Sequence, residues 1–350
     1  MVENSILWDR YPLVARHPLA RSWLICEASY GRAPNTIDAY ARAREDFFTF
    51  CAGRGIKPEL ATKEHVALWV GELTSRPHRR GANVKAIDSG AGLSNATLQQ
   101  KVTAVRLFFD FLIEEGFRAN NPVGRGRYTP GKGFAGHRDR ALIPRYRKLP
   151  WIPGDDEWQA ITGAVKTEPL RNRAMFLLCY DAALRRDELC SLGISDFDFS
   201  HQLVTVRFDV AKRRRERVVP FSDKTAGLLV RYVQHRRTLS IERGRLFLSE
   251  SNRNRATPIS YWSWSKIIEG VARRSGIERF TTHTLRHLRL TDLARSGWDI
   301  HEIATYAGHA NSETTRCYIH LSGRDLSEKI RRGMDQIHKW RLSVTAKELG

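Results

Sequence analysis

The sequence lacks paired cysteines, long apolar runs and a balance of positive and negative charge. Each of these absences excludes a class of protein. The five cysteines are an odd number with wide, irregular spacing and no CxxC pair, which argues against a disulfide framework and a zinc ribbon. We expect them to be small apolar side chains in a reducing compartment. They are Cys26, Cys51, Cys179, Cys190 and Cys317.

Apolar runs are short throughout the chain. No stretch approaches the roughly 18 consecutive apolar residues of a membrane span, and the N-terminus has no apolar signal core. These absences predict a cytoplasmic protein with no membrane partner.

Acidic residues are too few to balance the basic ones. The 350 residues include 38 Asp and Glu against 58 Lys and Arg, a formal charge of +20. With 41% hydrophobic and 10% aromatic residues, the chain has enough apolar mass to fold, so the charge is no sign of disorder. It predicts a polyanionic partner, with nucleic acid first and an anionic membrane surface second. Charge kept for solubility is the alternative.

The location of the charge favours nucleic acid. Residues 123–150 lose all periodicity and hold eight basic residues against one acidic residue, so they carry +7 of the +20. This composition is typical of a linker, and such a concentration suits a strap along a phosphate backbone better than it suits solubility. The predicted DNA contacts in this linker are Arg125, Arg127, Lys132, Arg138, Arg140, Arg145, Arg147 and Lys148.

The residues on either side of this linker have different patterns. Residues 1–122 show helical spacing of apolar residues over 37–48, from about 62, and over 98–113, which predicts a compact all-α unit. Residues 151–350 predict a mainly helical α+β domain with a small antiparallel sheet. Its hairpin strands are expected at 203–206 and 218–221. Its helices are expected at 158–165, 175–180, 225–233 and 260–272, and from 283 almost to the end.

Four motifs stand in one order in residues 151–350: ALRRDEL at 183–189, AKRRRER at 211–217, HTLRH at 283–287, and GHA at 308–310 followed by Tyr318. Taken singly, each has a plain structural explanation. Arg185 could form a surface ion pair, and Tyr318 alone would be a core residue. His283 and His287 have the spacing of a zinc protease, but Thr284 stands where that site needs a glutamate, so the metal interpretation fails.

In combination, these motifs resemble the tyrosine recombinase family, which includes phage integrases and Xer-like site-specific recombinases. Residues 281–320 resemble the family's most diagnostic segment almost end to end, and the resemblance covers roughly residues 20–330. It implies an all-α, SAM-like core-binding domain at 1–122 and a basic interdomain linker at 123–150. A tyrosine recombinase catalytic domain with a C-terminal assembly helix would then occupy 151–350.

The residue types suit metal-free cleavage of a DNA strand. Two guanidinium groups, on Arg185 and Arg286, bind non-bridging phosphate oxygens bidentately and stay charged, and His309 adds a third donor. Glu188 either orients Arg185 or is an ordinary acid on a helix surface.

The reacting groups complete the expected site. Tyr318 attacks the phosphate and, by the resemblance, forms a 3′-phosphotyrosyl link with release of a 5′ hydroxyl. Lys212, on a mobile hairpin, protonates the leaving oxygen, while His283 accepts the tyrosine proton or positions the phosphate. Because the phosphotyrosyl ester stores the energy of the phosphodiester, we expect no metal, ATP or other cofactor.

The sequence departs from the family pattern at two places. Ala183 stands where the family usually has glycine, which is a small change if the position is helical. The hairpin lacks the family's glycines, but alignment on the following residues places Lys212 on the catalytic lysine. The other basic residues of the turn are predicted DNA contacts: Arg213, Arg214 and Arg215.

The sequence therefore predicts a DNA recombinase for integration, excision or resolution of a DNA element. Its expected partners are double-stranded recombination sites in the nucleoid and three further copies of itself in a homotetramer. The apolar residues after Tyr318 predict a C-terminal helix that docks on a neighbouring protomer or packs on its own domain. The alternatives are a type IB topoisomerase, which shares the catalytic residues, and a DNA-binding regulator on a recombinase scaffold.

Overall fold

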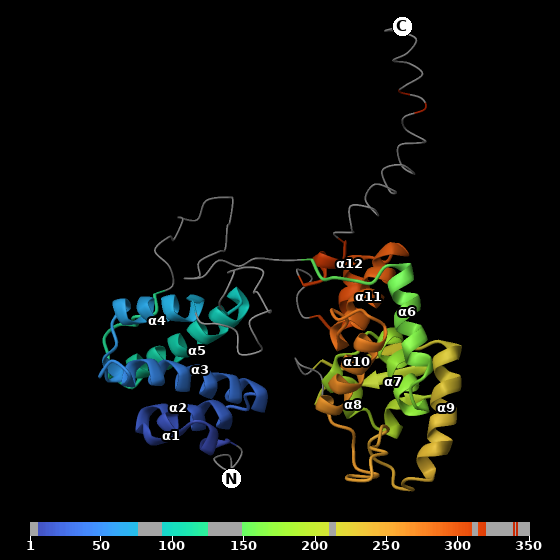
Figure 1. The fold of residues 1–350 in the computed structure, drawn as a ribbon, viewed down its shortest axis with the longest axis horizontal. Helices are drawn as coiled ribbons and strands as arrows, with labels where there is room; N and C mark the ends of the chain where they lie inside the picture. The colour runs from blue at the N-terminus through green and yellow to red at the C-terminus, as the bar shows by residue number, and fades with distance from the viewer. Residues whose placement is uncertain are drawn as a thin grey trace. The chain divides into compact units, whose positions relative to one another are not determined.

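The computed structural model describes residues 6–75, 93–124, 149–209, 215–309 and 314–319, together with Lys339 and Arg341. The chain divides into two compact units, Met1–Arg147 and Lys148–Gly350 (Figure 1). Each unit has its own hydrophobic core, so each is described by itself.

The described part of the N-terminal unit is helical, with α1 (Pro12–Arg16), α2 (Pro18–Ser29), α3 (Pro34–Ala52), α4 (Lys63–Ser75) and α5 (Asn95–Glu114). Short 3₁₀ turns lie at Trp8–Arg10 and Pro58–Leu60. The long helices α3 and α5 pack on each other through aromatic rings, with Phe47 contacting Phe109 edge-on and α4 adding Trp69. The three helices predicted from apolar spacing are confirmed as α3, α4 and α5.

The C-terminal unit contains helices and a small sheet. Its helices are α6 (Asp155–Lys166), α7 (Leu170–Asp181), α8 (Arg186–Ser191), α9 (Asp223–Arg237), α10 (Tyr261–Arg274), α11 (Thr282–Arg295), α12 (Ile300–Ala307) and α13 (Arg316–Ile319). Its strands are β1 (Phe197–Asp198), β2 (Leu203–Val206) and β3 (Arg217–Pro220), after a 3₁₀ turn at Ile194–Asp196. The mainly helical fold with a small antiparallel sheet is therefore as predicted.

The sheet is a three-stranded antiparallel meander in the order β1-β2-β3. In the β2–β3 hairpin, Leu203 pairs with Pro220 and Val206 pairs with Arg217. Residues 207–216 connect the two strands, so Arg217 stands at the base of the turn that carries the AKRRRER motif.

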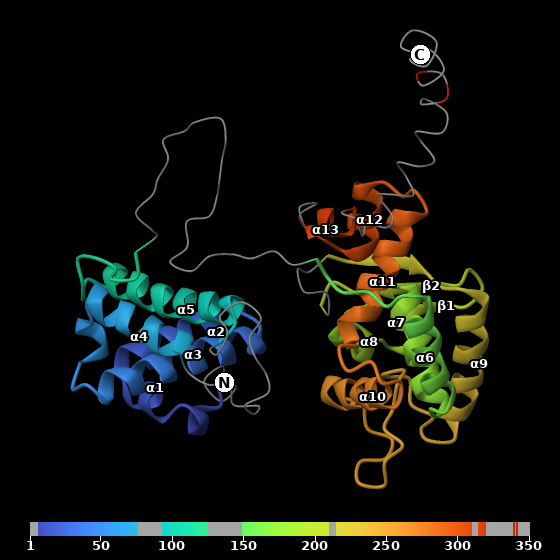
Figure 2. The ribbon, with the colours of Figure 1, turned by 45° about the horizontal axis from the view of Figure 1, so that its top comes forward.

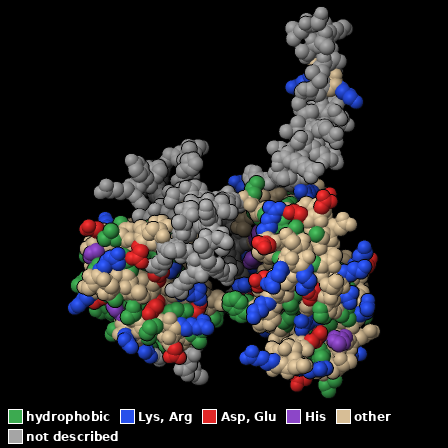
Figure 3. Space-filling model, viewed as in Figure 1, with side chains coloured by type: hydrophobic (Ala, Val, Ile, Leu, Met, Phe, Trp, Pro, Cys, Tyr) green, Lys and Arg blue, Asp and Glu red, His purple; other side chains and the backbone are tan. Residues whose placement is uncertain are grey.

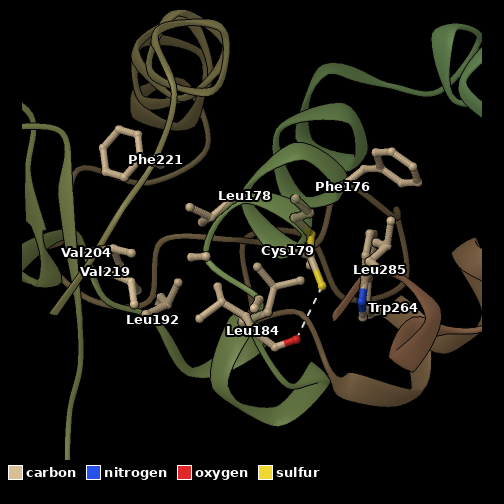
Figure 4. Close-up of a cluster of buried hydrophobic side chains, with 14 of the residues drawn as sticks. Phe176, Leu178, Cys179, Leu184, Leu192, Val204, Val219, Phe221, Trp264 and Leu285 are labelled. Atoms are coloured by element: carbon tan, nitrogen blue, oxygen red, sulfur yellow. Dashed lines mark hydrogen bonds between the residues drawn. The ribbon is translucent and has the colours of Figure 1, made fainter. Parts of the chain in front are cut away.

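Helix α7 lies at the centre of the C-terminal core and contacts α6, α9 and α11. Figure 4 shows Phe176, Leu178 and Cys179 of α7 among buried side chains from the sheet and from α10 and α11. The Cys179 thiol donates to the carbonyl of Leu184, 3.5 Å away, just beyond the end of α7. All five cysteines are free, and Cys51, Cys179 and Cys190 are buried, as expected for small apolar side chains.

The helices expected from residue 283 almost to the end are found as far as Ile319 within the described residues. In the described residues this region contains three helices, and glycines at φ +92 (Gly297) and φ +61 (Gly308) lie after α11 and α12. A residue with a left-handed conformation ends the right-handed helix. Glycine adopts this conformation without the strain that a side chain would cause. Helix α11 contacts both α12 and α13 (Figure 2).

None of the helices in the described ranges is long and apolar enough to span a membrane.

Candidate active site

The predicted cationic residues come from segments that end or begin helices. Arg185 is the N-cap residue of α8, immediately after the turn that follows α7. Arg286 lies in the first half of α11, and His309 follows the left-handed Gly308 that caps α12. Tyr318 lies on the short helix α13. The fold thus brings together Arg185, Arg286, His309 and Tyr318.

Glu188 is the most enclosed charged group of the site, with a side chain only 1% exposed. One carboxylate oxygen accepts from the Arg185 guanidinium at 2.7 Å, and the other accepts from the Arg185 backbone N–H at 2.9 Å. Arg217 donates to both oxygens, at 2.7 and 3.2 Å. The alternative of an ordinary surface acid is therefore wrong, because Glu188 is buried and holds Arg185 in place.

Charge compensation keeps this buried carboxyl ionised. Burial alone would raise the pKa of Glu188, but the hydrogen bond and charge of Arg217, followed by the charge of Arg185, lower it to about 2. This carboxylate is a strong constraint, because losing it would leave the guanidinium groups of Arg185 and Arg217 without a common counter-charge.

Arg217 is a residue that sequence reasoning missed. The sequence pattern makes it the last residue of a basic turn, yet its side chain is 5% exposed and reaches from β3 to Glu188. It also lies under Gly308, where a Cβ atom would come within 3.0 Å of Arg217 Nη1 and 3.2 Å of its Cδ. Arg217 therefore joins the hairpin to the Arg185 motif and to the Gly308-His309 motif. The signal available in the sequence was its place directly beside the apolar strand residues 218 and 219.

Arg286 is buried, at 4% exposure, and is held by backbone carbonyl groups. Its Nη1 donates to the carbonyl of Ala183 and its Nη2 to the carbonyl of Ala307, each at 2.5 Å. Burial, followed by the like charge of Arg185, lowers the pKa of Arg286 to about 9, so the group remains cationic near pH 7. These bonds fix a positive charge between the α7–α8 turn and the end of α12.

His309 is held on both ring nitrogens. Its Nε2 lies 3.0 Å from Nη2 of Arg286, and its Nδ1 lies 2.9 Å from the hydroxyl of Thr315. Burial, followed by the charges of Arg286 and Arg185, lowers the pKa of His309 to about 3. The ring is therefore neutral near pH 7.

Tyr318 is buried, with 4% of the residue exposed, and its ring stacks on that of His309 with centroids 6.2 Å apart and an interplanar angle of 9°. Its hydroxyl lies 2.9 Å from Nδ1 of His287. Burial, above all, raises the pKa of Tyr318 to about 12. His287 is the second residue that sequence reasoning missed, although the HTLRH motif contained it.

His283, the histidine predicted to accept the tyrosine proton, lies one helical turn before His287. The two ring centroids are 6.3 Å apart. The His287 side chain lies within hydrogen-bonding distance of the Tyr318 hydroxyl.

Several predicted residues lie outside the described ranges. Of the turn, Lys212, Arg213 and Arg214 are not described, and Arg215 is exposed. The linker residues are likewise outside the description: Arg125, Arg127, Lys132, Arg138, Arg140, Arg145, Arg147 and Lys148. On the C-terminal unit, Lys and Arg side chains are distributed over the visible face and not gathered in one patch (Figure 3).

Ala183 corrects an expectation about the first motif. The position is not helical, because Ala183 has φ +46, in the left-handed region that favours glycine. The turn needs this conformation to direct the Ala183 carbonyl at Arg286. The glycine that the family usually has here therefore corresponds to a backbone requirement, which alanine meets with strain.

Comparison with known proteins gives relatives along most of the chain. Residues 154–324 match the phage integrase family. The tyrosine recombinase XerD of Oceanobacillus iheyensis is 29% identical over 305 residues, covering 85% of this chain and 91% of that protein. Transposase A of transposon Tn554 from Staphylococcus aureus is 26% identical over 323 residues, covering 87% of this chain and 88% of that protein.

Solved structures show the same fold. The XerH site-specific recombinase bound to a palindromic difH substrate has a TM-score of 0.63 at 17% identity, covering 90% of this chain and 84% of that one. The Tn1549 transposon integrase in complex with transposon right-end DNA has a TM-score of 0.55 at 15% identity, covering 78% of this chain and 85% of that one.

Together with these relatives, the buried arginines and the adjacent tyrosine define an enzyme of the tyrosine-type DNA strand-transferase class. Residues 154–324 of the chain match the phage integrase family, and the relatives that align along most of the chain include tyrosine recombinases.

Replacing Ala183 with glycine is expected to stabilise the C-terminal unit. Alanine in the left-handed region costs about 1–2 kcal/mol, of which the greater freedom of glycine in the unfolded chain removes part, so the net gain is up to about 1 kcal/mol. Denaturant unfolding of the full chain measures it. Ala182→Gly is the matched control, since Ala182 has φ −91 and should lose stability. Equal losses in both variants would contradict the strain at Ala183.

The charge of Glu188 predicts a pH dependence of stability. Because folding lowers its pKa to about 2, its contribution is complete above the unfolded pKa near 4.5 and is lost as the pH falls toward 2. The contribution is on the order of 3 kcal/mol. The difference in unfolding free energy between the wild type and Glu188→Gln should narrow over this interval. A constant difference from pH 5 to pH 2 would show that Glu188 is not held ionised.

Proposed function

We propose that this enzyme is a site-specific recombinase that cuts and rejoins DNA through a 3′-phosphotyrosyl intermediate, for integration, excision or resolution of a DNA element. One observation carries the proposal: Tyr318 lies in a buried cluster with His309, which is itself bonded to Arg286. A tyrosine hydroxyl and fixed guanidinium groups are the groups that a strand transfer at phosphorus requires.

Arg185 and Arg286 would hold the scissile phosphate. Arg185 keeps 20% of its side chain exposed, so its free N–H groups can receive phosphate oxygens while Glu188 fixes its orientation. Arg286 adds a second, buried cation whose direction is set by the Ala183 and Ala307 carbonyls. Cations fixed before the substrate arrives stabilise the charge that develops on the phosphorane without reorganising.

The proposed cleavage step balances as follows. The hydroxyl oxygen of Tyr318 forms a bond to phosphorus while its proton passes to His283, the predicted acceptor, and the bond from phosphorus to the 5′ oxygen breaks. Lys212, on the β2–β3 turn, gives a proton to that leaving oxygen. The 5′ hydroxyl of another strand reverses the step and restores a phosphodiester. The phosphotyrosyl ester retains the bond energy, so rejoining needs no ATP. The guanidinium groups supply the positive charge that stabilises the negative phosphate.

Double-stranded DNA is the proposed partner. The charge of +20 and the family match support it, and the similar XerH and Tn1549 proteins are recorded in complexes with DNA. We assign core binding to residues 1–122, the strap along the backbone to 123–150 with Arg213, Arg214 and Arg215, and chemistry to 151–350. This assignment places the enzyme on the nucleoid.

Assembly into a homotetramer on two synapsed sites belongs to the same proposal. The residues after Ile319 carry the apolar positions Leu321, Leu326, Ile330, Met334 and Ile337, which we propose as the contact between protomers.

A type IB topoisomerase is the alternative function. The named relatives are recombinases and a transposase, which favours the recombinase. A two-site recombination assay beside a supercoil-relaxation assay separates the two functions. Relaxation without any recombination would favour the topoisomerase, and inactivity in both assays with intact DNA binding would indicate a regulator.

Tyr318→Phe is expected to abolish the covalent protein–DNA complex on a nicked suicide substrate, because it removes the one attacking oxygen. DNA binding should be unchanged in a mobility-shift assay. Tyr306→Phe is the matched control, since Tyr306 is also a buried tyrosine of this unit and its hydroxyl donates to the carbonyl of Asp181. A covalent complex that persists in Tyr318→Phe would refute the assignment.

Lys212→Ala is expected to slow cleavage far less when the leaving 5′ oxygen is replaced by sulfur, because a thiolate leaves without a proton. The ratio of cleavage rates on the two substrates measures this effect. Arg214→Ala removes a neighbouring positive charge and should weaken both reactions equally. An equal loss on both substrates in Lys212→Ala would show that the proton comes from another group.

A further inference from the structure

Thr315 is a buried threonine that lies between His309 and Tyr318 in the sequence, and it is 0% exposed. Its hydroxyl oxygen is 2.9 Å from Nδ1 of His309. Its backbone carbonyl accepts from the backbone N–H of Tyr318 at 3.0 Å. This one residue therefore contacts both the ring that lies beside Arg286 and the helix that carries the nucleophile.

The hydrogen bonds of His309 fix the position of its ring proton in this structure. An arginine can only donate, so Nε2 of His309, which lies 3.0 Å from Nη2 of Arg286, must be the acceptor. The neutral ring then carries its proton on Nδ1, and this N–H donates to the hydroxyl of Thr315. In this tautomer Nε2 has no proton to offer to a phosphate oxygen.

We propose that Thr315 is a positioning residue whose hydroxyl pairs with both tautomers of His309, so that Nε2 can change from accepting from Arg286 to donating to the scissile phosphate. This inference rests on the proposed function. In the first tautomer the Thr315 hydroxyl accepts from Nδ1–H, and in the second it donates to the Nδ1 lone pair. The ring gives the Nδ1 proton to solvent and takes one from solvent on Nε2, so the proton count and the charge are unchanged.

The position opposite Nδ1 requires a hydroxyl group. A hydroxyl both donates and accepts, whereas a carbonyl oxygen only accepts and an ammonium group only donates, so neither could pair with both tautomers. The ring itself needs no rotation, and it stays stacked on the Tyr318 ring at an interplanar angle of 9°. Burial, followed by the charges of Arg286 and Arg185, lowers the pKa of His309 to about 3, which favours exchange between two neutral forms.

The same exchange releases a donor of Arg286. Nη2 of Arg286 donates to the carbonyl of Ala307 and to Nε2 of His309. A phosphate oxygen that replaces Nε2 as the acceptor would receive this N–H, while the new N–H of His309 donates to the same phosphate. His309 thus keeps a buried guanidinium donor paired until the phosphate binds, since an unpaired buried donor is costly.

Two substitutions of Thr315 test the proposal in the full chain on the nicked suicide substrate, with DNA binding and thermal unfolding measured in parallel. Thr315→Val replaces the hydroxyl with a methyl group, and we expect covalent complex formation to slow about tenfold, the effect of one lost hydrogen bond. Thr315→Ser keeps the hydroxyl and should retain most of the wild-type rate. Thr291→Val is the control, since Thr291 is also buried and its hydroxyl donates to a carbonyl of its own helix.

A double variant separates positioning through His309 from a purely structural role of Thr315. In His309→Ala the ring is missing, so adding Thr315→Val should change the rate less than about twofold, because the two residues act as one unit. A tenfold loss in both backgrounds would overturn the proposal. Cleavage by Thr315→Val at the wild-type rate would also overturn it.

Nitrogen NMR of histidine-labelled protein identifies the protonated nitrogen of His309 without any cleavage. Tyr318→Phe, which cannot attack, is measured alone and with the same duplex, and the signals of His309 are those that His309→Ala removes. We expect the proton on Nδ1 without DNA and on Nε2 with DNA. The same tautomer in both samples, or a ring protonated on both nitrogens with DNA, would contradict the proposal. Absence of a covalent complex in the wild type would instead refute the proposed function.

Discussion

The buried carboxylate of Glu188 is the interaction on which the site depends. It accepts hydrogen bonds from Arg185 and Arg217, which belong to segments about thirty residues apart in sequence and which would otherwise repel each other. A carboxylate removed from water is costly unless it is paired and fully hydrogen-bonded. The side chains of Arg185 and Arg217 therefore have little freedom to move away from Glu188. Glu188 thereby fixes the direction of Arg185 and the base of the β2–β3 hairpin together.

The second constraint follows from the first. Because Arg217 fills the space beneath Gly308, the residue before His309 has no room for a side chain, and its φ of +61 also favours glycine. Arg286 closes the arrangement by donating to carbonyls on both sides, from Ala183 and Ala307. The cations of the site are therefore held by protein groups before any phosphate arrives, which is the condition for electrostatic preorganisation.

Much of this arrangement could be predicted from the sequence. Apolar periodicity predicted the long helices, and alternation predicted the hairpin, because core contacts repeat with the period of each element. The grouping of Arg185, Arg286, His309 and Tyr318 depended on the order of motifs. Their hydrogen bonds could not be predicted, because the partners are set by tertiary packing.

The errors have the same physical origin. Ala183 has a side chain, so its left-handed φ is not visible in the residue type. Arg217 and His287 look like an ordinary turn arginine and a second histidine until the fold directs one at Glu188 and the other at Tyr318. The boundaries of the helices expected from residue 283 onward are set by Gly297 and Gly308, whose positive φ values separate α11, α12 and α13.

The most direct test of the central claim is to find the atom of the protein that carries the DNA. The covalent complex trapped on a suicide substrate would be digested with nuclease and trypsin and the nucleotide adduct located by tandem mass spectrometry. The account predicts a single adduct on Tyr318, in the tryptic peptide that begins at Cys317. An adduct on any other residue, such as Tyr306 or a serine, would contradict it.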